Sequence, residues 1–136
     1  MDFKDFEELE FPQAPTERVG EVYVLLFVMK SGETLFYVGQ TMRFTGRMDD
    51  YFWAQFTAST DFKVGEAIKY LRDELGYRII VRHKPSSNRL GEEKSIIDGL
   101  RNEGVRLLNG CPNYDYKAAN EIDVRKAIRA YCDTLT

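Results

Sequence analysis

The sequence predicts an α+β fold: a small, three-stranded, mostly antiparallel sheet flanked by helices, with an extra helix at the C-terminus. Two stretches rich in β-branched and aromatic residues, 22–29 and 34–38, are separated by a turn and indicate a β-hairpin. Apolar residues at helical spacing follow the hairpin, and a third strand-like stretch, 77–81, lies among them. The predicted order is strand, strand, helix, helix, strand, helix, helix.

The segment before the hairpin is acidic. Residues 1–19 contain Pro12 and Pro15 and have no sustained periodicity, so we interpret them as an N-terminal arm in front of a single domain over residues 20–136. The net charge of the whole chain is −3, but residues 1–21 alone carry −5, so the remainder carries +2. The arm is therefore acidic and the domain mildly basic, which leaves a polyanionic partner possible for the domain.

The hairpin and the two helices after it are predicted from short local signals. Residues 30–33 form the turn, and Gly39 is expected to break the second strand. Within residues 43–54 the apolar side chains recur at helical spacing, although Gly46 disfavours a helix there. A second helical stripe covers residues 64–75, and Gly76 is suitably placed to end it.

The last part of the chain contains a basic segment and two more helices. The third strand, 77–81, continues into a loop, and no acidic residue lies between positions 77 and 91. A helix is expected over residues 89–102, and a final helix over 118–135 begins with a possible capping box at Asn120 and Asp123. The cationic side chains of the basic segment are Arg78, Arg82, Lys84 and Arg89.

Composition excludes several classes of protein. Two cysteines, Cys111 and Cys132, and one histidine, His83, cannot assemble a zinc cluster. The longest apolar run, residues 22–29, is far shorter than the roughly 20 residues that span a membrane, and the acidic N-terminus does not resemble a signal peptide. We therefore expect a cytoplasmic protein with no membrane partner. His83, which has no histidine or cysteine partner, is expected at the surface.

Glu93 is the most unusual residue of the predicted helices. On a helical wheel that starts at Leu90, the apolar residues Ile96, Ile97 and Leu100 centre near about 305°, and Glu93 lies near about 300°. A carboxylate in the middle of an apolar stripe is unfavourable unless a cation or hydrogen bonds satisfy it. A metal site, a buried salt bridge, and a side chain that extends to solvent from an imperfect helix all remain open for this residue.

Aromatic and basic residues give weaker signals. Tyr23 and Tyr37 lie on the two strands of the hairpin, where most tyrosines pack in the core or at its rim. Arg47 and Tyr51 are i, i+4 neighbours on one helix. An arginine there could bind a phosphate with two hydrogen bonds, or it could be an exposed residue beside a packed tyrosine.

The order and spacing of these residues resemble the GIY-YIG nuclease superfamily. The first motif is Val22-Tyr23, the second is Tyr37-Val38-Gly39, and Arg47, Tyr51, Glu93 and Asn109 follow. The sequence over residues 36–52 looks most like the nuclease domain of the excision-repair incision subunit, a member of that family. The resemblance covers roughly residues 20–110. It departs from the family pattern at Glu21, which stands in place of a glycine, and in the longer segment before Asn109.

The resemblance implies a role for each matched residue. Tyr23 would activate the attacking water, and Tyr37 would support the site by hydrogen bonding. Tyr51 falls at a catalytic position where many members of the family have a histidine and some have a tyrosine. Arg47 would hold the scissile phosphate, and Glu93 would bind one divalent ion, Mg²⁺ or Mn²⁺. Gly39 would provide a tight strand exit, and Asn109 would close the site near the substrate.

The sequence therefore predicts a divalent-metal-dependent endonuclease that hydrolyses DNA phosphodiester bonds with a single metal ion. Arg78, Arg82, Lys84 and Arg89 are expected to line the substrate groove. RNA as the substrate and a homodimer as the active form both remain open. The alternative is a catalytically silent module of the same fold that binds nucleic acid or a protein partner.

Overall fold

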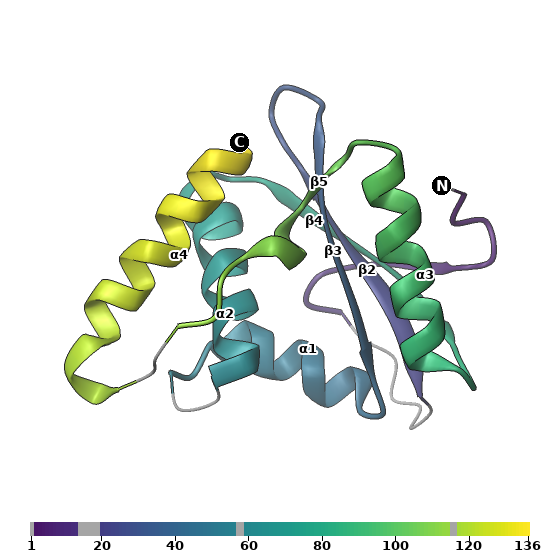
Figure 1. Ribbon diagram of the computed structural model, residues 1–136, viewed down its shortest axis with the longest axis horizontal. Coiled ribbons are helices and arrows are strands. Elements are labelled where there is room, and N and C mark those ends of the chain that lie inside the picture. Colours follow the sequence, from purple (N-terminus) through teal and green to yellow (C-terminus); the bar gives the residue numbers. More distant parts are fainter. Residues whose placement is uncertain (1, 14–19, 57–58, 115–116) are drawn as a thin grey trace.

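The computed structural model describes residues 2–13, 20–56, 59–114 and 117–136, and their fold is α+β, as the sequence predicts. One mixed sheet has helices on both of its faces (Figure 1). The strands of the described residues are β1 (Glu7–Glu10), β2 (Glu21–Val28), β3 (Thr34–Thr41), β4 (Arg78–Pro85) and β5 (Arg106–Leu107). The α-helices are α1 (Phe44–Trp53), α2 (Ser59–Ile68), α3 (Arg89–Asn102) and α4 (Glu121–Leu135).

The three predicted strands form the antiparallel centre of the sheet. The strand order is β1-β4-β2-β3-β5, and β2 pairs antiparallel with both β3 and β4. The prediction of a three-stranded sheet is wrong in number, because the described residues form five strands. β5 is parallel to β3, which makes the sheet mixed, and its two residues are too short to give a periodic signal.

β1 lies inside the segment that the sequence indicates to be a loose arm, so that interpretation is wrong for residues 7–10. β1 pairs antiparallel with β4, and its glutamates form ion pairs there: Glu8 with Arg82 at 3.1 Å and Glu10 with Arg78 at 2.7 Å. Phe11, which follows β1, is buried in the core. Cross-strand charge pairs and one buried ring therefore hold this strand, and neither produces the alternating pattern on which strand prediction relies.

The two faces of the sheet belong to two separate parts of the core. Tyr23 and Leu25 of β2 point towards α1, α2 and α4, whereas Val22 and Val24 point towards α3. Figure 1 shows α3 on one side of the sheet and the other three helices on the opposite side. Because both faces of β2 are covered, its sequence is continuously apolar instead of alternating.

The predicted helices are present with shifted ends. α1 and α3 lie within or at the predicted bounds, and α1 includes Gly46. α2 begins earlier than predicted and continues as a π-helical segment, Lys69–Glu74. Gly76 has φ +75°, the left-handed conformation that ends this segment. Before α4, residues Ala118–Asn120 form a short 3₁₀ helix, as Leu108–Gly110 do after β5.

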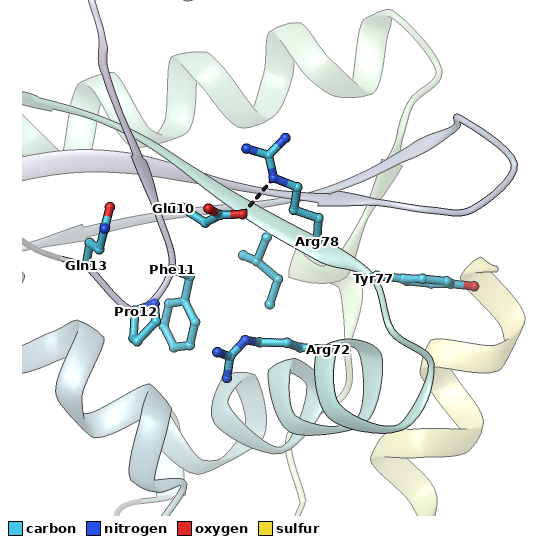
Figure 2. A pocket seen from close by; sticks show the side chains of 8 residues that line it. Glu10, Phe11, Pro12, Gln13, Arg72, Tyr77 and Arg78 are labelled. Atoms are coloured by element: carbon cyan, nitrogen blue, oxygen red, sulfur yellow. Dashed lines mark hydrogen bonds and ion pairs between the residues drawn. The ribbon is translucent and has the colours of Figure 1, made fainter.

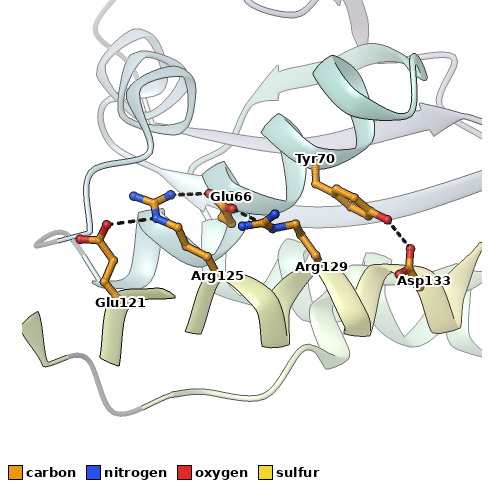
Figure 3. A network of polar contacts seen from close by, with 6 residues as sticks. All are labelled: Glu66, Tyr70, Glu121, Arg125, Arg129 and Asp133. Carbon is orange, nitrogen blue, oxygen red and sulfur yellow. Dashed lines mark hydrogen bonds and ion pairs between the residues drawn. The ribbon is translucent and has the colours of Figure 1, made fainter. Parts of the chain in front are cut away.

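α4 is attached to α2 through a polar network as well as through apolar contacts (Figure 3). Glu66 of α2 is buried and forms ion pairs with two arginines of α4. Arg125 Nη1 lies 2.5 Å and Arg129 Nε lies 3.5 Å from its carboxylate oxygens. Farther along the interface, the Tyr70 hydroxyl donates a hydrogen bond of 2.6 Å to Asp133. The network fixes α4 along the length of α2.

We predict that Glu66→Ala lowers the free energy of unfolding by about 1–3 kcal/mol, because it leaves two arginines beside a buried surface without their shared carboxylate. Urea denaturation followed by circular dichroism measures the change. Asp98→Ala is the matched control: it removes the carboxylate of an exposed i, i+4 ion pair with Lys94, for which we expect a loss of at most about 0.5 kcal/mol. Equal effects of the two substitutions would contradict a special contribution from Glu66.

Candidate active site

A direct hydrogen bond between two tyrosine hydroxyls joins the sheet to α1. The Oη atoms of Tyr23 in β2 and Tyr51 in α1 are 2.6 Å apart. Tyr23 is 0% exposed and Tyr51 is 1% exposed, so neither ring is open to solvent. The sequence predicted both residues for the site, and the structure brings them together in its interior.

Gly39 makes the space for this hydrogen bond. It lies directly opposite Tyr23 in the β2–β3 pairing, and a Cβ atom on it would be 2.4 Å from both Cζ and Oη of Tyr23. The phenol therefore crosses β3 where that strand has no side chain. The expectation that Gly39 ends the strand is wrong, because β3 continues to Thr41.

Tyr37 completes a group of three phenols. Its ring meets that of Tyr51 edge-on, with centroids 6.5 Å apart and planes at 88°. Unlike the other two, Tyr37 is partly exposed. Burial raises the pKa of all three phenols above the ordinary tyrosine value, and a neighbouring phenol raises each pKa further, although the hydrogen bond with Tyr51 lowers the pKa of Tyr23. All three are therefore protonated at neutral pH.

Arg47 lies one helical turn before Tyr51 and provides the positive charge beside the phenols. Its Nε atom is 3.3 Å from Oδ1 of Asp61 in α2. Burial lowers the pKa of Arg47, but the neighbouring Tyr23, Tyr51 and Asp61 raise it more, so the guanidinium remains protonated. In turn, the guanidinium favours the ionised forms of Tyr23, Tyr37 and Tyr51.

Glu93 approaches this group from the other side of the sheet. β5 pairs with β3 only at Leu35 and Phe36, so no strand covers the β3 edge at Tyr37, and the electrostatic neighbours of Glu93 include Tyr37. Burial raises the pKa of Glu93, and the nearby Arg47 opposes that rise. With the described residues its carboxylate forms no hydrogen bond or ion pair, whereas the neighbouring Glu92 binds Lys84 and Ser86.

The helical wheel placed Glu93 correctly beside apolar neighbours, since Ile96 and Leu100 of α3 are buried. Glu93 itself is only half-buried. Its place at the start of α3, near the edge of β3 at Tyr37, makes Tyr37 and Arg47 its electrostatic neighbours.

Asn109 completes the uncovered edge of β3. Its side-chain Oδ1 accepts a hydrogen bond of 2.9 Å from the backbone N–H of Val38, and its Nδ2 donates one of 2.8 Å to the Val38 carbonyl. The amide thereby substitutes for a neighbouring strand. Both of its polar groups are used in this way, so Asn109 fixes the strand that contains Tyr37 and Gly39.

The structure separates three of the four basic residues from the phenols. Arg82 and Lys84 lie opposite Val24 and Val22, on the α3 face of the sheet, and the ion pairs of Arg82 and Arg78 are with β1. Arg89 lies near the site: it is one helical turn before Glu93 and donates a hydrogen bond to the side chain of Gln40 in β3. Of the four, Arg89 has a neutral partner, so within the described parts of the chain no carboxylate balances its charge.

The sequence interpretation missed a buried pair next to Tyr23. His83 is 3% exposed, so the expectation of a surface histidine is wrong. Its Nδ1 lies 2.7 Å from Oε1 of the equally buried Glu21, and its ring stacks on Phe44 with centroids 4.7 Å apart. Glu21 is the residue that departs from the glycine of the family motif. Its position two residues before Tyr23, on the same face of β2, was the signal that could have indicated its burial.

A separate cavity of about 330 Å³ lies at the end of β1 (Figure 2). Phe11, Pro12, Arg72 and Tyr77 are among its lining residues, and the guanidinium of Arg72 lies 5.7 Å from the centroid of the Phe11 ring. None of the three phenols, Arg47 or Glu93 lines it. The cavity is therefore distinct from the candidate active site.

The donor set at the site suits a cation that needs few protein ligands. Within the described ranges no three histidine, cysteine, aspartate or glutamate side chains are gathered as metal ligands. Glu93 offers one carboxylate that no other described side chain binds. Mg²⁺ fits such a position, because it is commonly held by one or two carboxylates and keeps several of its waters.

Comparison with known proteins gives no identification. The chain matches no family model, no curated protein and no solved structure. Among the described residues, no helix has the length and apolar character required to cross a membrane. The residues and the geometry of the site are therefore what indicates the function of this chain.

We predict that Tyr23→Phe and Tyr51→Phe each lower the free energy of unfolding by about 1–3 kcal/mol, because each removes the hydrogen bond between the two buried hydroxyls. The double substitution removes both hydroxyls and should cost little more than either single one. A double-mutant cycle from urea denaturation measures the coupling. Tyr77→Phe, at a tyrosine that is partly exposed, is the control. Strict additivity of the two single effects would contradict the hydrogen bond.

Proposed function

We propose that this chain is a divalent-metal-dependent endonuclease of GIY-YIG type that hydrolyses DNA phosphodiester bonds. The observation that best supports the proposal is the unpaired, half-buried carboxylate of Glu93 beside Arg47 and a partly exposed phenol. These groups come from α3, α1 and β3, and the sequence resemblance assigns roles to the same positions. In this proposal β4, β2 and β3 correspond to the three-stranded core of that family, and β1 and β5 are additions to it.

Arg47 is suited to binding the scissile phosphate. Its guanidinium stays protonated and is partly exposed, with 25% of its side chain accessible. A fixed positive charge beside the phosphoryl oxygens stabilises the negative charge that develops on them during hydrolysis. Arg89, whose charge no carboxylate of the described residues balances, is suited to binding the nucleic-acid backbone beside the reacting phosphate.

Glu93 would hold Mg²⁺ or Mn²⁺. When bound, such an ion stabilises charge on the phosphoryl and leaving oxygens. The nearby guanidinium favours the ionised form of Glu93, the form that a cation requires, against the effect of burial. The carboxylate needs no prior release from another side chain among the described residues before it binds the ion.

The burial of the phenols favours Tyr37 over Tyr23 as the group that contacts the attacking water. Tyr23 is 0% exposed, and its hydroxyl already pairs with Tyr51. Tyr37 is partly exposed and has Glu93 and Arg47 as electrostatic neighbours. Because its pKa is raised, we propose that its hydroxyl orients the water through a hydrogen bond as a neutral group. Tyr23 would then support the site by holding α1 in place through Tyr51.

We predict that the purified protein nicks or linearises supercoiled plasmid in the presence of Mg²⁺ or Mn²⁺ and not in EDTA. Glu93→Gln preserves the size of the side chain but removes its charge, so it should reduce the cleavage rate by about 100-fold or more. Gel electrophoresis of the relaxed and linear products gives the rate.

Glu92→Gln is the matched control, since it changes the same residue type one position earlier on α3, where the carboxylate binds Lys84. It should cleave at nearly the wild-type rate. Cleavage that persists in Glu93→Gln would refute the assigned site. Absence of cleavage by the wild type with either metal, on plasmid and on branched or single-stranded DNA, would favour the catalytically silent binding module.

A further inference from the structure

Arg47 lies between two carboxylates that have different environments. Oδ1 of Asp61, in the first turn of α2, lies 3.3 Å from the Nε atom of Arg47. Glu93 of α3 is an electrostatic neighbour of Arg47 but does not form a salt bridge with it. Asp61 is only 17% exposed in its side chain. The buried Nε atom of Arg47 has no hydrogen-bond partner among the described residues, and its contact with Asp61 is an ion pair at a distance of 3.3 Å.

The surroundings of Asp61 maintain this ion pair. The charged groups that face it come from α1 and from the residue before it: Arg47 and Arg43 are positive, and Asp50 is negative. Asp50 is itself bound by Arg43 at 2.9 Å, so Arg43 is already committed and Arg47 remains the cation available to Asp61. Burial raises the pKa of Asp61, Arg47 lowers it, and Asp50 raises it.

We propose that Asp61 is a positioning residue that fixes the Nε edge of the Arg47 guanidinium and thereby keeps Arg47 from pairing with Glu93. This inference depends on the proposed function, because it explains how Glu93 stays open for a metal ion beside a strong cation. The guanidinium has five N–H donors in a rigid plane, so holding one edge orients the remaining donors towards the phenols and the substrate. Glu93 is a second carboxylate that has Arg47 as an electrostatic neighbour.

The first test needs neither substrate nor metal. In a ¹H–¹⁵N NMR spectrum, the Nε–H signal of Arg47 is assigned by its loss in Arg47→Lys and followed as the pH is lowered. We expect it to report the protonation of Asp61 at a higher pH than that of an ordinary aspartate. Asp61→Ala should shift the signal, and adding Glu93→Gln to Asp61→Ala should shift it again, because the arginine has moved to Glu93.

The second test measures cleavage. Asp61→Asn and Asp61→Ala should reduce kcat by about 10-fold to 100-fold, while KM for DNA changes by less than about 3-fold, because a misdirected guanidinium affects the reacting phosphate more than general affinity. Asp61→Glu should restore part of the rate. Asp73→Asn is the control: it changes an exposed aspartate at 3.5 Å from Arg72 and should leave kcat unchanged.

The outcomes separate the two proposals. An Arg47 signal that is the same in Asp61→Ala and the wild type would overturn the positioning role, whether or not the protein cleaves DNA. A shifted signal with an unchanged kcat would also overturn it, since the ion pair would then only join α1 to α2. Absence of cleavage by the wild type, together with an NMR signal that moves as expected, would refute the nuclease and not the ion-pair geometry.

Discussion

The arrangement of the site depends on the missing side chain at Gly39. Any Cβ at this position would overlap the phenol of Tyr23. Because the space is empty, Tyr23 extends across β3 and its hydroxyl reaches Tyr51 on α1. That hydrogen bond sets the rotation of α1 about its own axis, and Arg47 lies on the same side of this helix, one turn earlier. A single glycine in a strand, together with the buried Phe44 and Met48 of α1, therefore contributes to where the positive charge of the site lies.

The predictions from sequence succeeded where a local pattern of apolar residues determines the structure. They failed where ion pairs between residues far apart in the sequence determine it. The hairpin, α1, α3 and the helical place of Glu93 follow from periodicity, which the core enforces. β1 was missed because its three glutamates resemble a solvated segment, and their partners lie about 70 residues away in sequence. Likewise, His83 has no local signal of burial, and its partner Glu21 is identified only by the β2–β4 register.

The same limit applies to the candidate site. Its residue types and spacing could be predicted, but the depth of each phenol could not, because it depends on how α1 packs on the sheet. Tyr23 and Tyr37 are equivalent in the sequence, each on one strand of a hairpin, yet one is fully buried and the other is partly exposed. The basic segment is also less available to a polyanion than its sequence suggests, because the glutamates of β1 and Glu92 form ion pairs with most of its cationic side chains. Arg89 is distinguished only by its neutral partner, Gln40.

The polar contacts of α2 connect the C-terminal helix to the site. Glu66 faces α4 and binds Arg125 and Arg129, whereas Asp61 faces α1 and pairs with Arg47. These two carboxylates lie on one helix five residues apart, about 140° around its axis. The three ion pairs therefore add directional contacts to the apolar packing of α2, two of them with α4 and one with α1. The C-terminal helix and the helix that carries the guanidinium are thus both joined to α2 by buried or half-buried carboxylates.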